Sequence, residues 1–334
     1  MAQENTFVFG KFLPFHCGHE ALIRFALSTH AYVYVLVCAG SNEQLSGEVR
    51  QTWIRETFAS ELERMYIVVV PYDESRLPNT SVSSREVSAL WAAHFNTLLQ
   101  GKVQSLVTSE PYGEYVASYM QIKHITYDPA RKQVSISATK IRQQLSEYWH
   151  FLPAAVQRYY ATKVVILGSE SVGKTTLTQF LGDFFKAHII TEAARDLIAH
   201  SEQTSLHDLL QVIALHTKNI EKADCQMLTC IDTDWHITAS YAHFLLQTEL
   251  EVSQNIVNTQ KAHLYLYLTC EVPYVQDGTR LAAEARLALD QSHKDFLREK
   301  GVNYVLISGN DWHSRTQQAI NHIRACLALR QIIC

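Results

Sequence analysis

The chain has 334 residues, 47% of them hydrophobic and 19% charged, which is typical of a soluble protein with two cores of average size. Its formal net charge of -4 gives no overall positive field that would attract a polyanion, so charge alone does not favour nucleic acid as the main partner. Seven cysteines without a C-x-x-C pair argue against a disulfide framework or a structural zinc site, and they indicate a reducing compartment, which we expect to be the cytoplasm. The N-terminal residues lack the pattern of a signal peptide, and the longest apolar run, 31–40, is too short to span a bilayer.

A short strand is predicted over 6–9, and a glycine-containing segment follows it directly. This segment reads Gly-Lys-Phe-Leu-Pro-Phe-His-Cys-Gly-His over 10–19, and a helical pattern begins at Glu20. His16 and His19 should therefore face one point at a helix N-terminus. Imidazole and backbone N–H groups placed there can donate to phosphate oxygens during phosphoryl or nucleotidyl transfer.

Two other interpretations of the histidine pair are a metal site and simple helix capping. Zinc normally needs three or four protein ligands, and no second cluster at ligand spacing lies nearby. Capping alone explains neither the Gly-x-x-x-Pro-x-His-x-Gly-His spacing nor its place after the first strand.

The segment resembles the signature of the nucleotidyltransferases with an H-x-G-H site, a superfamily with a Rossmann-like parallel sheet. The resemblance implies nucleotide contacts from Gly10, Lys11, Phe12 and Gly18.

The rest of the first half alternates short strands with helices, which is the sequence form of a parallel sheet. Strands are predicted over 32–38, 66–70 and 105–108, and helices over about 48–60 and 84–99. Because ligands gather at the carboxyl ends of parallel strands, Ser109 and Glu110 are candidate nucleotide-binding residues. Either Tyr112 or Trp91 could supply a flat partner for a ring, although a single aromatic residue more often belongs to a core.

A second phosphate motif, Ile-Ser-Ala-Thr-Lys-Ile-Arg, occupies 136–142. Ser137 is a good helix N-cap, and Thr139 falls in the first turn. Arg142 can place its guanidinium beside the anion that the helix end attracts. The S-x-x-K spacing is not a β-lactamase-type nucleophile, because the companion motifs are absent. The segment resembles the I-S-x-T-x-I-R motif with which these nucleotidyltransferases bind the phosphates of ATP.

The second half opens on a G-x-x-x-x-G-K-T loop. An apolar strand pattern precedes it and a helical pattern follows it, as a phosphate-binding P-loop requires. Lys174 reaches the β- and γ-phosphates in such a loop, and the hydroxyl of Thr175 can hold Mg²⁺. The expected nucleotide-binding residues of this loop are Gly168, Ser169, Glu170, Ser171, Val172, Gly173, Thr175 and Thr176.

Later segments bring acidic and basic side chains toward the same loop. Glu192 follows a predicted strand, and Asp232 and Asp234 end another, where P-loop proteins keep the carboxylate associated with Mg²⁺. A surface acid pair is the alternative, but the place directly after a strand favours a function. The segment 275–280 resembles a mobile kinase lid, in which Arg280 closes over the transferring phosphoryl group. The N-K-x-D motif of GTPases is absent, so a kinase fits better.

In this order, the two sets of motifs resemble the NadR-type bifunctional enzymes, which combine nicotinamide-nucleotide adenylyltransferase with ribosylnicotinamide kinase. The resemblance spans nearly the full chain, including the aromatic pair at 148–149 and Ile-Asp-Thr-Asp at 231–234. It implies an α/β fold with two parallel-sheet domains. Residues 1–150 would form a Rossmann-like adenylyltransferase domain, 151–162 an aromatic-rich joint, and 163–334 a P-loop kinase domain.

The resemblance also implies ATP and Mg²⁺ as cofactors, nicotinamide riboside and nicotinamide mononucleotide as substrates, and NAD as the product. The kinase step needs a base for the riboside hydroxyl; we expect Asp232, near Mg²⁺ and supported by Asp234, with Glu192 as the alternative. The adenylyl transfer needs none, because the attacking phosphate is already ionised. There we expect catalysis by positioning and charge stabilisation from His16, His19 and Arg142.

Two features depart from the family pattern. The first predicted strand begins near Thr6, so we expect neither the helix-turn-helix of some members nor DNA binding. Gln-Asp-Gly at 276–278 replaces the two acids that are usual in the lid. The alternative function is a NAD-sensing regulator, or the partner of a membrane transporter, with slow turnover. The sequence leaves a homo-oligomer open.

Overall fold

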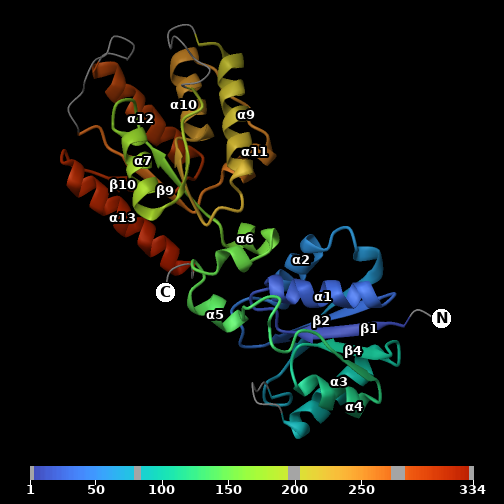
Figure 1. Ribbon diagram of the computed structural model, residues 1–334. Coiled ribbons are helices and arrows are strands. Elements are labelled where there is room, and N and C mark those ends of the chain that lie inside the picture. Colours follow the sequence, from blue (N-terminus) through green and yellow to red (C-terminus); the bar gives the residue numbers. More distant parts are fainter. Residues whose placement is uncertain (1–3, 79–83, 195–203, 272–282, 331–334) are drawn as a thin grey trace. The chain divides into compact units, whose positions relative to one another are not determined.

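The computed structural model describes residues 4–78, 84–194, 204–271 and 283–330. These residues form two compact units that divide between Tyr159 and Tyr160, within the aromatic-rich segment 151–162. Each unit is built on a five-stranded parallel sheet with helices on both faces, which confirms the predicted α/β fold class (Figure 1).

Strands and helices alternate along the first unit. In chain order they are β1 (Thr6–Gly10), α1 (Cys17–Thr29), β2 (Val33–Gly40), α2 (Gly47–Thr57), η1 (Leu62–Arg64), β3 (Met65–Tyr72), α3 (Arg85–Leu99), β4 (Ser105–Thr108), α4 (Tyr112–Met120), β5 (Lys123–Thr126), α5 (Ala138–Gln143), η2 (Trp149–Phe151) and α6 (Ala154–Tyr160). The predicted elements are all present, with ends that differ by up to three residues, and α4, β5 and α6 are elements that the sequence patterns did not predict.

The strand order β3-β2-β1-β4-β5 determines where a ligand can enter the first unit. The chain winds outward from β1 through β2 to β3, and then crosses to β4 on the other side of β1. Helices α1 and α2 cover one face of the sheet, and α3 and α4 cover the other (Figure 1). The carboxyl ends of β1 and β4 therefore flank a topological switch point, where open α/β sheets bind ligands.

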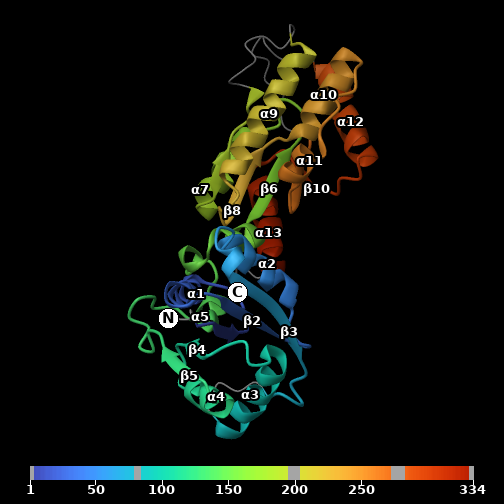
Figure 2. The same ribbon diagram turned by 90° about the vertical axis from the view of Figure 1, so that its right-hand side faces the viewer.

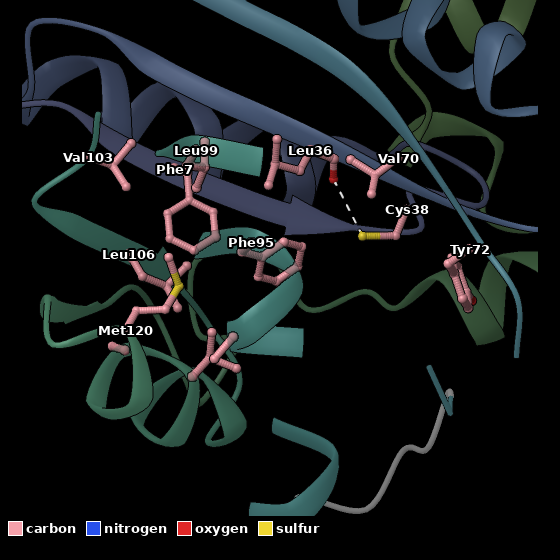
Figure 3. Packing of buried hydrophobic residues seen from close by; sticks show 13 residues of the cluster. Phe7, Leu36, Cys38, Val70, Tyr72, Phe95, Leu99, Val103, Leu106 and Met120 are labelled. Atoms are coloured by element: carbon pink, nitrogen blue, oxygen red, sulfur yellow. Dashed lines mark hydrogen bonds between the residues drawn. The ribbon is translucent and has the colours of Figure 1, made fainter. Parts of the chain in front are cut away.

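A large apolar core joins the sheet of the first unit to α3 and α4. Phe7 and Leu36 from neighbouring strands meet Phe95 of α3, and the rings of Phe7 and Phe95 lie edge to face with centroids 5.5 Å apart (Figure 3). These three side chains are fully buried, and burial of each contributes about 1.5–3 kcal/mol. This core fixes the sheet to which the β1–α1 loop is attached.

The second unit follows the same βα alternation. Its elements are β6 (Thr162–Leu167), α7 (Lys174–Phe185), β7 (His188–Ile190), α9 (Leu206–Lys222), β8 (Leu228–Asp232), α10 (Trp235–Leu246), α11 (Gln254–Gln260), β9 (Leu264–Leu268), α12 (Ala283–Glu299), β10 (Val305–Ile307) and α13 (Trp312–Leu329). The strand order is β10-β9-β6-β8-β7, so the strand that leads into the P-loop is central.

Alternating side chains of the central strand β6 pack on opposite faces of the second sheet. Val165 and Leu167 belong to a buried cluster with residues of α9, α10 and α12, whereas α7 packs beside α13 (Figures 1 and 2). Because β6 is covered on both faces, its carboxyl end is held rigidly, and so is the loop that begins there.

Candidate nucleotide-binding and active sites

His16 is the N-cap of α1, as the capping interpretation proposed. Its backbone is extended, and its Nδ1 accepts a hydrogen bond from the backbone N–H of Gly18 at 3.1 Å. A ring nitrogen that accepts carries no proton, so in the neutral ring Nε2 carries it and can act as a donor. His19 lies against this ring with centroids 3.7 Å apart, and its own Nδ1 is buried without a hydrogen-bond partner among the described residues. Capping therefore accounts for one nitrogen of His16 and for none of His19.

Both imidazoles are neutral at physiological pH. Burial, together with the nearby charge of Arg131, lowers the pKa of His16 to about 3. Burial also holds the pKa of His19 well below its usual value, and the proximity of His16 and Arg131 adds to the effect. The pair can consequently donate N–H groups to an anion without bringing a full positive charge. Arg131 follows β5 and forms an ion pair with Glu110 at 2.7 Å, and no motif in the sequence indicates it.

A cavity of about 320 Å³ lies at the switch point of the first unit. It gathers residues from the β1–α1 loop, the end of β4, the segment after β5 and the start of α5. The sequence-predicted residues that line it are Gly10, Lys11, Phe12, His16, Gly18, His19, Ser109, Glu110, Ser137, Thr139 and Arg142. The fold thus brings together, in one cavity, two motifs that are more than a hundred residues apart in the sequence.

The second motif adopts the predicted helix start. The Ser137 hydroxyl accepts from the backbone N–H of Lys140, and Arg142 donates to the Thr139 hydroxyl at 3.2 Å. Arg142 also donates to the carbonyl of Leu13 in the β1–α1 loop. The guanidinium therefore ties α5 to the histidine motif.

Lys11 is held by a charged network that the sequence analysis missed. Its Nζ lies 2.8 Å from the Glu43 carboxylate, whose other oxygen accepts from Arg50 at 2.7 Å. Arg50 is fully buried and also donates to the backbone carbonyl of Lys11 at 2.6 Å. Both the backbone and the ammonium group of Lys11 are thereby fixed.

A second, smaller cavity of about 120 Å³ shares Phe9, Gly10, Lys11 and Tyr112 with the first. Four of its twelve lining residues are aromatic, and Trp91 and Tyr112 are two of them. The Trp91 ring is oriented by a hydrogen bond from Nε1 to a backbone carbonyl at 3.3 Å. The two aromatic residues considered in the sequence therefore lie where a ring could bind.

In the second unit the loop 168–173 has the backbone of a phosphate-binding loop. Gly168 and Gly173 have φ values of 141° and 92°, which disfavour any side chain, and a Cβ at Gly168 would lie 2.8 Å from the Leu268 carbonyl. Lys174 is the first residue of α7, and its Nζ donates to the Ser169 carbonyl at 2.9 Å. The ammonium group thus lies over the loop that it is predicted to serve.

Thr175 and Asp232 meet at the mouth of this loop. The Thr175 hydroxyl donates to Oδ2 of Asp232 at 2.6 Å, and Asp232 is fully buried at the carboxyl end of β8. One hydroxyl and one carboxylate fit Mg²⁺, which P-loop proteins complete with nucleotide phosphates and water rather than with a full set of protein ligands. No group of three or more His, Cys, Asp or Glu side chains arranged for a metal occurs within the described ranges.

The two other predicted carboxylates occupy different positions. Asp234 caps α10, with one oxygen accepting from the backbone N–H of His236 at 3.0 Å and the other within 2.6 Å of its ring. Glu192 follows β7 and is half-buried. Its charge, with that of Glu170, adds to the effect of burial and raises the pKa of Tyr241 to about 12. Arg280 and the rest of the predicted lid lie outside the described residues.

A buried arginine from α13 holds the backbone of the P-loop by hydrogen bonds to one of its carbonyl groups and to those of neighbouring segments. Arg315 is 1% exposed and donates to the carbonyls of Val172 at 3.0 Å and Gly309 at 2.6 Å. It also donates to the carbonyl and hydroxyl of Thr269, just after β9. A lone arginine in an amphipathic helix gives no sign of this role in the sequence.

The fold and the two sites define a two-unit α/β protein that pairs an H-x-G-H nucleotidyltransferase-like unit with a P-loop unit. A family model described as an AAA domain matches residues 163–315. Among the helices of the described residues, none has the length and apolar character needed to cross a membrane.

Over nearly its whole length the chain is similar to NadR proteins, as the motifs predicted. It is 24% identical to the "Trifunctional NAD biosynthesis/regulator protein NadR" of Escherichia coli (strain K12) and to that of Salmonella typhimurium, over 95% of this chain and 82% of each relative. A crystal structure of NadR protein in complex with NAD and AMP-PNP aligns at a TM-score of 0.60, with 21% identity, over 98% of this chain and 97% of that chain. A NadR structure in complex with NR aligns at 0.61, also with 21% identity, over 97% and 96%.

Proposed function

We propose that the chain makes NAD in two steps: the second unit phosphorylates nicotinamide riboside with ATP, and the first unit adenylylates the resulting mononucleotide with a second ATP. The observation that supports this proposal is that the residues of the predicted phosphate motifs come together in two separate places, one within each unit. Support for the substrate class comes from two sources: a curated relative is named for NAD biosynthesis, and two similar solved structures are NadR complexes, one with NAD and AMP-PNP and one with NR.

In the first unit, an oxygen of the mononucleotide phosphate forms a bond to the α-phosphorus of ATP, and the bond from that phosphorus to pyrophosphate breaks. No base is needed, because the attacking phosphate is ionised. The Nε2–H of His16, the neighbouring His19 ring and Arg142 all line the cavity where the α-phosphate would lie. They donate to oxygens that gain negative charge in the transition state, which is the main catalytic contribution that fixed donors make.

The mononucleotide would lie across the two cavities of the first unit. Its flat pyridine ring fits the aromatic walls formed by Trp91 and Tyr112. Lys11 lines both cavities, so it lies within reach of a phosphate held between the pyridine ring and the histidine motif. The buried Arg50 and Glu43 hold it there.

In the second unit, a riboside hydroxyl oxygen bonds to the γ-phosphorus of ATP, its proton leaves to a base, and ADP departs. Mg²⁺, when bound, would neutralise charge on the β- and γ-phosphates. Asp232 and Thr175 would hold this ion, since they already meet beside the P-loop. Because Asp232 is engaged with Thr175, we propose Glu192 as the proton acceptor in place of Asp232, which the sequence favoured. Lys174 would move from the Ser169 carbonyl to the phosphates.

A coupled assay with ATP, Mg²⁺ and either riboside or mononucleotide tests both steps on the purified protein. Lys174→Ala should abolish riboside phosphorylation and leave adenylylation mostly intact. His19→Ala should do the reverse, lowering the kcat of adenylylation by about a hundredfold or more with little change in ATP affinity. Loss of both activities in either folded variant would contradict the two-site model. Tight NAD binding with negligible turnover would favour the regulator suggested by the names of the relatives.

A further inference from the structure

The turn between Asp232 and Asp234 contains a strained residue. Thr233 has a φ of 67°, in the left-handed region, although its side chain is β-branched. Such residues are true outliers there, because Cβ and its substituents crowd the backbone, and the conformation persists only where surrounding contacts enforce it. Thr233 is 4% exposed, so these contacts must come from the protein.

Two hydrogen bonds hold the backbone of Thr233. Its N–H donates to the carbonyl of Ile166, at the end of the strand that leads into the P-loop. Its carbonyl lies 3.1 Å from Nε2 of His216, and because a carbonyl can only accept, the imidazole is the donor. His216 belongs to α9 and is 3% exposed, so the bond is shielded from water. The catalytic interactions described above do not use this buried histidine.

The residue before Thr233 carries the carboxylate that faces the P-loop. Asp232 accepts from the Thr175 hydroxyl at 2.6 Å. The residue after it, Asp234, caps α10. The backbone on the carboxyl side of Asp232 therefore makes its turn at Thr233 itself. If the peptide after Thr233 rotated toward an unstrained conformation, the path from β8 into α10 would change and Asp232 would shift relative to Thr175.

We propose that His216 is a positioning residue: its hydrogen bond to the Thr233 carbonyl keeps the turn left-handed, and this turn aims the Asp232 carboxylate at Thr175 and at the Mg²⁺ of a bound nucleotide. This inference rests on the nucleotide-binding part of the proposed function. It does not depend on which substrate receives the phosphoryl group.

Calorimetric binding of ADP at a series of Mg²⁺ concentrations measures this effect without turnover. His216→Leu keeps an apolar side chain of similar size but removes the donor. We expect it to raise the Mg²⁺ concentration needed for half-maximal tightening of ADP binding by about tenfold, with ADP affinity in EDTA unchanged. His216→Gln should keep a Mg²⁺ dependence close to that of the wild type, because the amide nitrogen of glutamine can occupy the position of Nε2 and donate to the Thr233 carbonyl.

A second substitution makes the test independent of stability. Glycine adopts a φ of 67° without strain, so Thr233→Gly in the His216→Leu background should return the Mg²⁺ dependence to near the wild-type value.

Thr217→Val is the matched control. It removes a neighbouring buried hydroxyl of α9 that accepts a hydrogen bond from Gln260 at 2.8 Å, and it leaves the contact between His216 and Thr233 in place. It should lower the melting temperature without changing the Mg²⁺ dependence.

The possible results separate this inference from the proposed function. An unchanged Mg²⁺ dependence in folded His216→Leu, or a failure of Thr233→Gly to restore it, would overturn the positioning role. If the wild-type protein binds ADP with Mg²⁺ and shows the expected pattern but does not phosphorylate the riboside, the kinase assignment fails and the role of His216 stands.

Discussion

Replacing Arg315 by methionine should destabilise the second unit strongly and weaken nucleotide binding, although Arg315 reaches no predicted ligand. Its guanidinium donates to three backbone carbonyls, those of Val172, Thr269 and Gly309. Methionine fills most of the same space and donates to none of them. The carbonyls of Val172 and Thr269 belong to buried residues, where each one left without a donor costs about 1–3 kcal/mol, and the partly exposed Gly309 carbonyl costs less, which gives about 2–6 kcal/mol in total.

The net effect is smaller than this total, because the variant no longer has to bury a charge. Burial lowers the pKa of Arg315, which shows that its desolvation opposes folding. Hydrogen bonds from a charged donor contribute about 1.5–3 kcal/mol each, so their loss outweighs this gain, and we expect a net loss of about 3–5 kcal/mol. Since Val172 is part of the P-loop, the affinity for ATP should also fall.

Guanidinium unfolding measures the loss, and the transition of the second unit is the one whose shift on addition of ATP is lost in Lys174→Ala. Arg298→Met is the control, because Arg298 is 73% exposed and pairs with Asp295 at 2.8 Å; it should cost less than about 1 kcal/mol. A loss below about 1 kcal/mol for Arg315→Met, or an unchanged affinity for ATP, would refute the idea that this arginine supports the loop.

Two further predictions concern the histidine pair. His16→Asn keeps a strong N-cap but removes the Nε2 donor, so it should leave the melting temperature nearly unchanged and lower the kcat of adenylylation by about a hundredfold; normal turnover would show that His16 only caps α1. Folding lowers the pKa of His16 and His19, so below pH 6.5 the unfolded state binds more protons than the folded state. As the pH is lowered from 6.5 to 5, the free energy of unfolding should therefore fall by up to about 1.4 kcal/mol per histidine for each pH unit. Denaturation at several pH values measures this slope, which His16→Asn should make shallower; an equal slope in both proteins would contradict the assigned pKa shifts.

The sequence by itself determined the two phosphate motifs and the class of fold around them. In both cases a strand, a glycine-containing loop and a helix follow one another within about fifteen residues, so local spacing alone fixes where the backbone N–H groups and the side chains of His19 or Lys174 must lie. The alternation of strands and helices could also be predicted from the hydrophobic pattern within each short segment. The short strands β5 and β10 were not predicted, because three or four residues carry too little periodicity and their partly exposed pattern resembles that of a loop.

Only the tertiary structure decided which side chains hold those motifs in place. Arg315 lies 143 residues from the Val172 carbonyl that it supports, and Arg50 and His216 likewise bind backbone groups on other elements. In the sequence each is one polar residue within an amphipathic helix, where an exposed position is the ordinary expectation. Whether it is buried depends on which helix face meets which strand end, and that is settled by packing across the sheet rather than by the residues beside it.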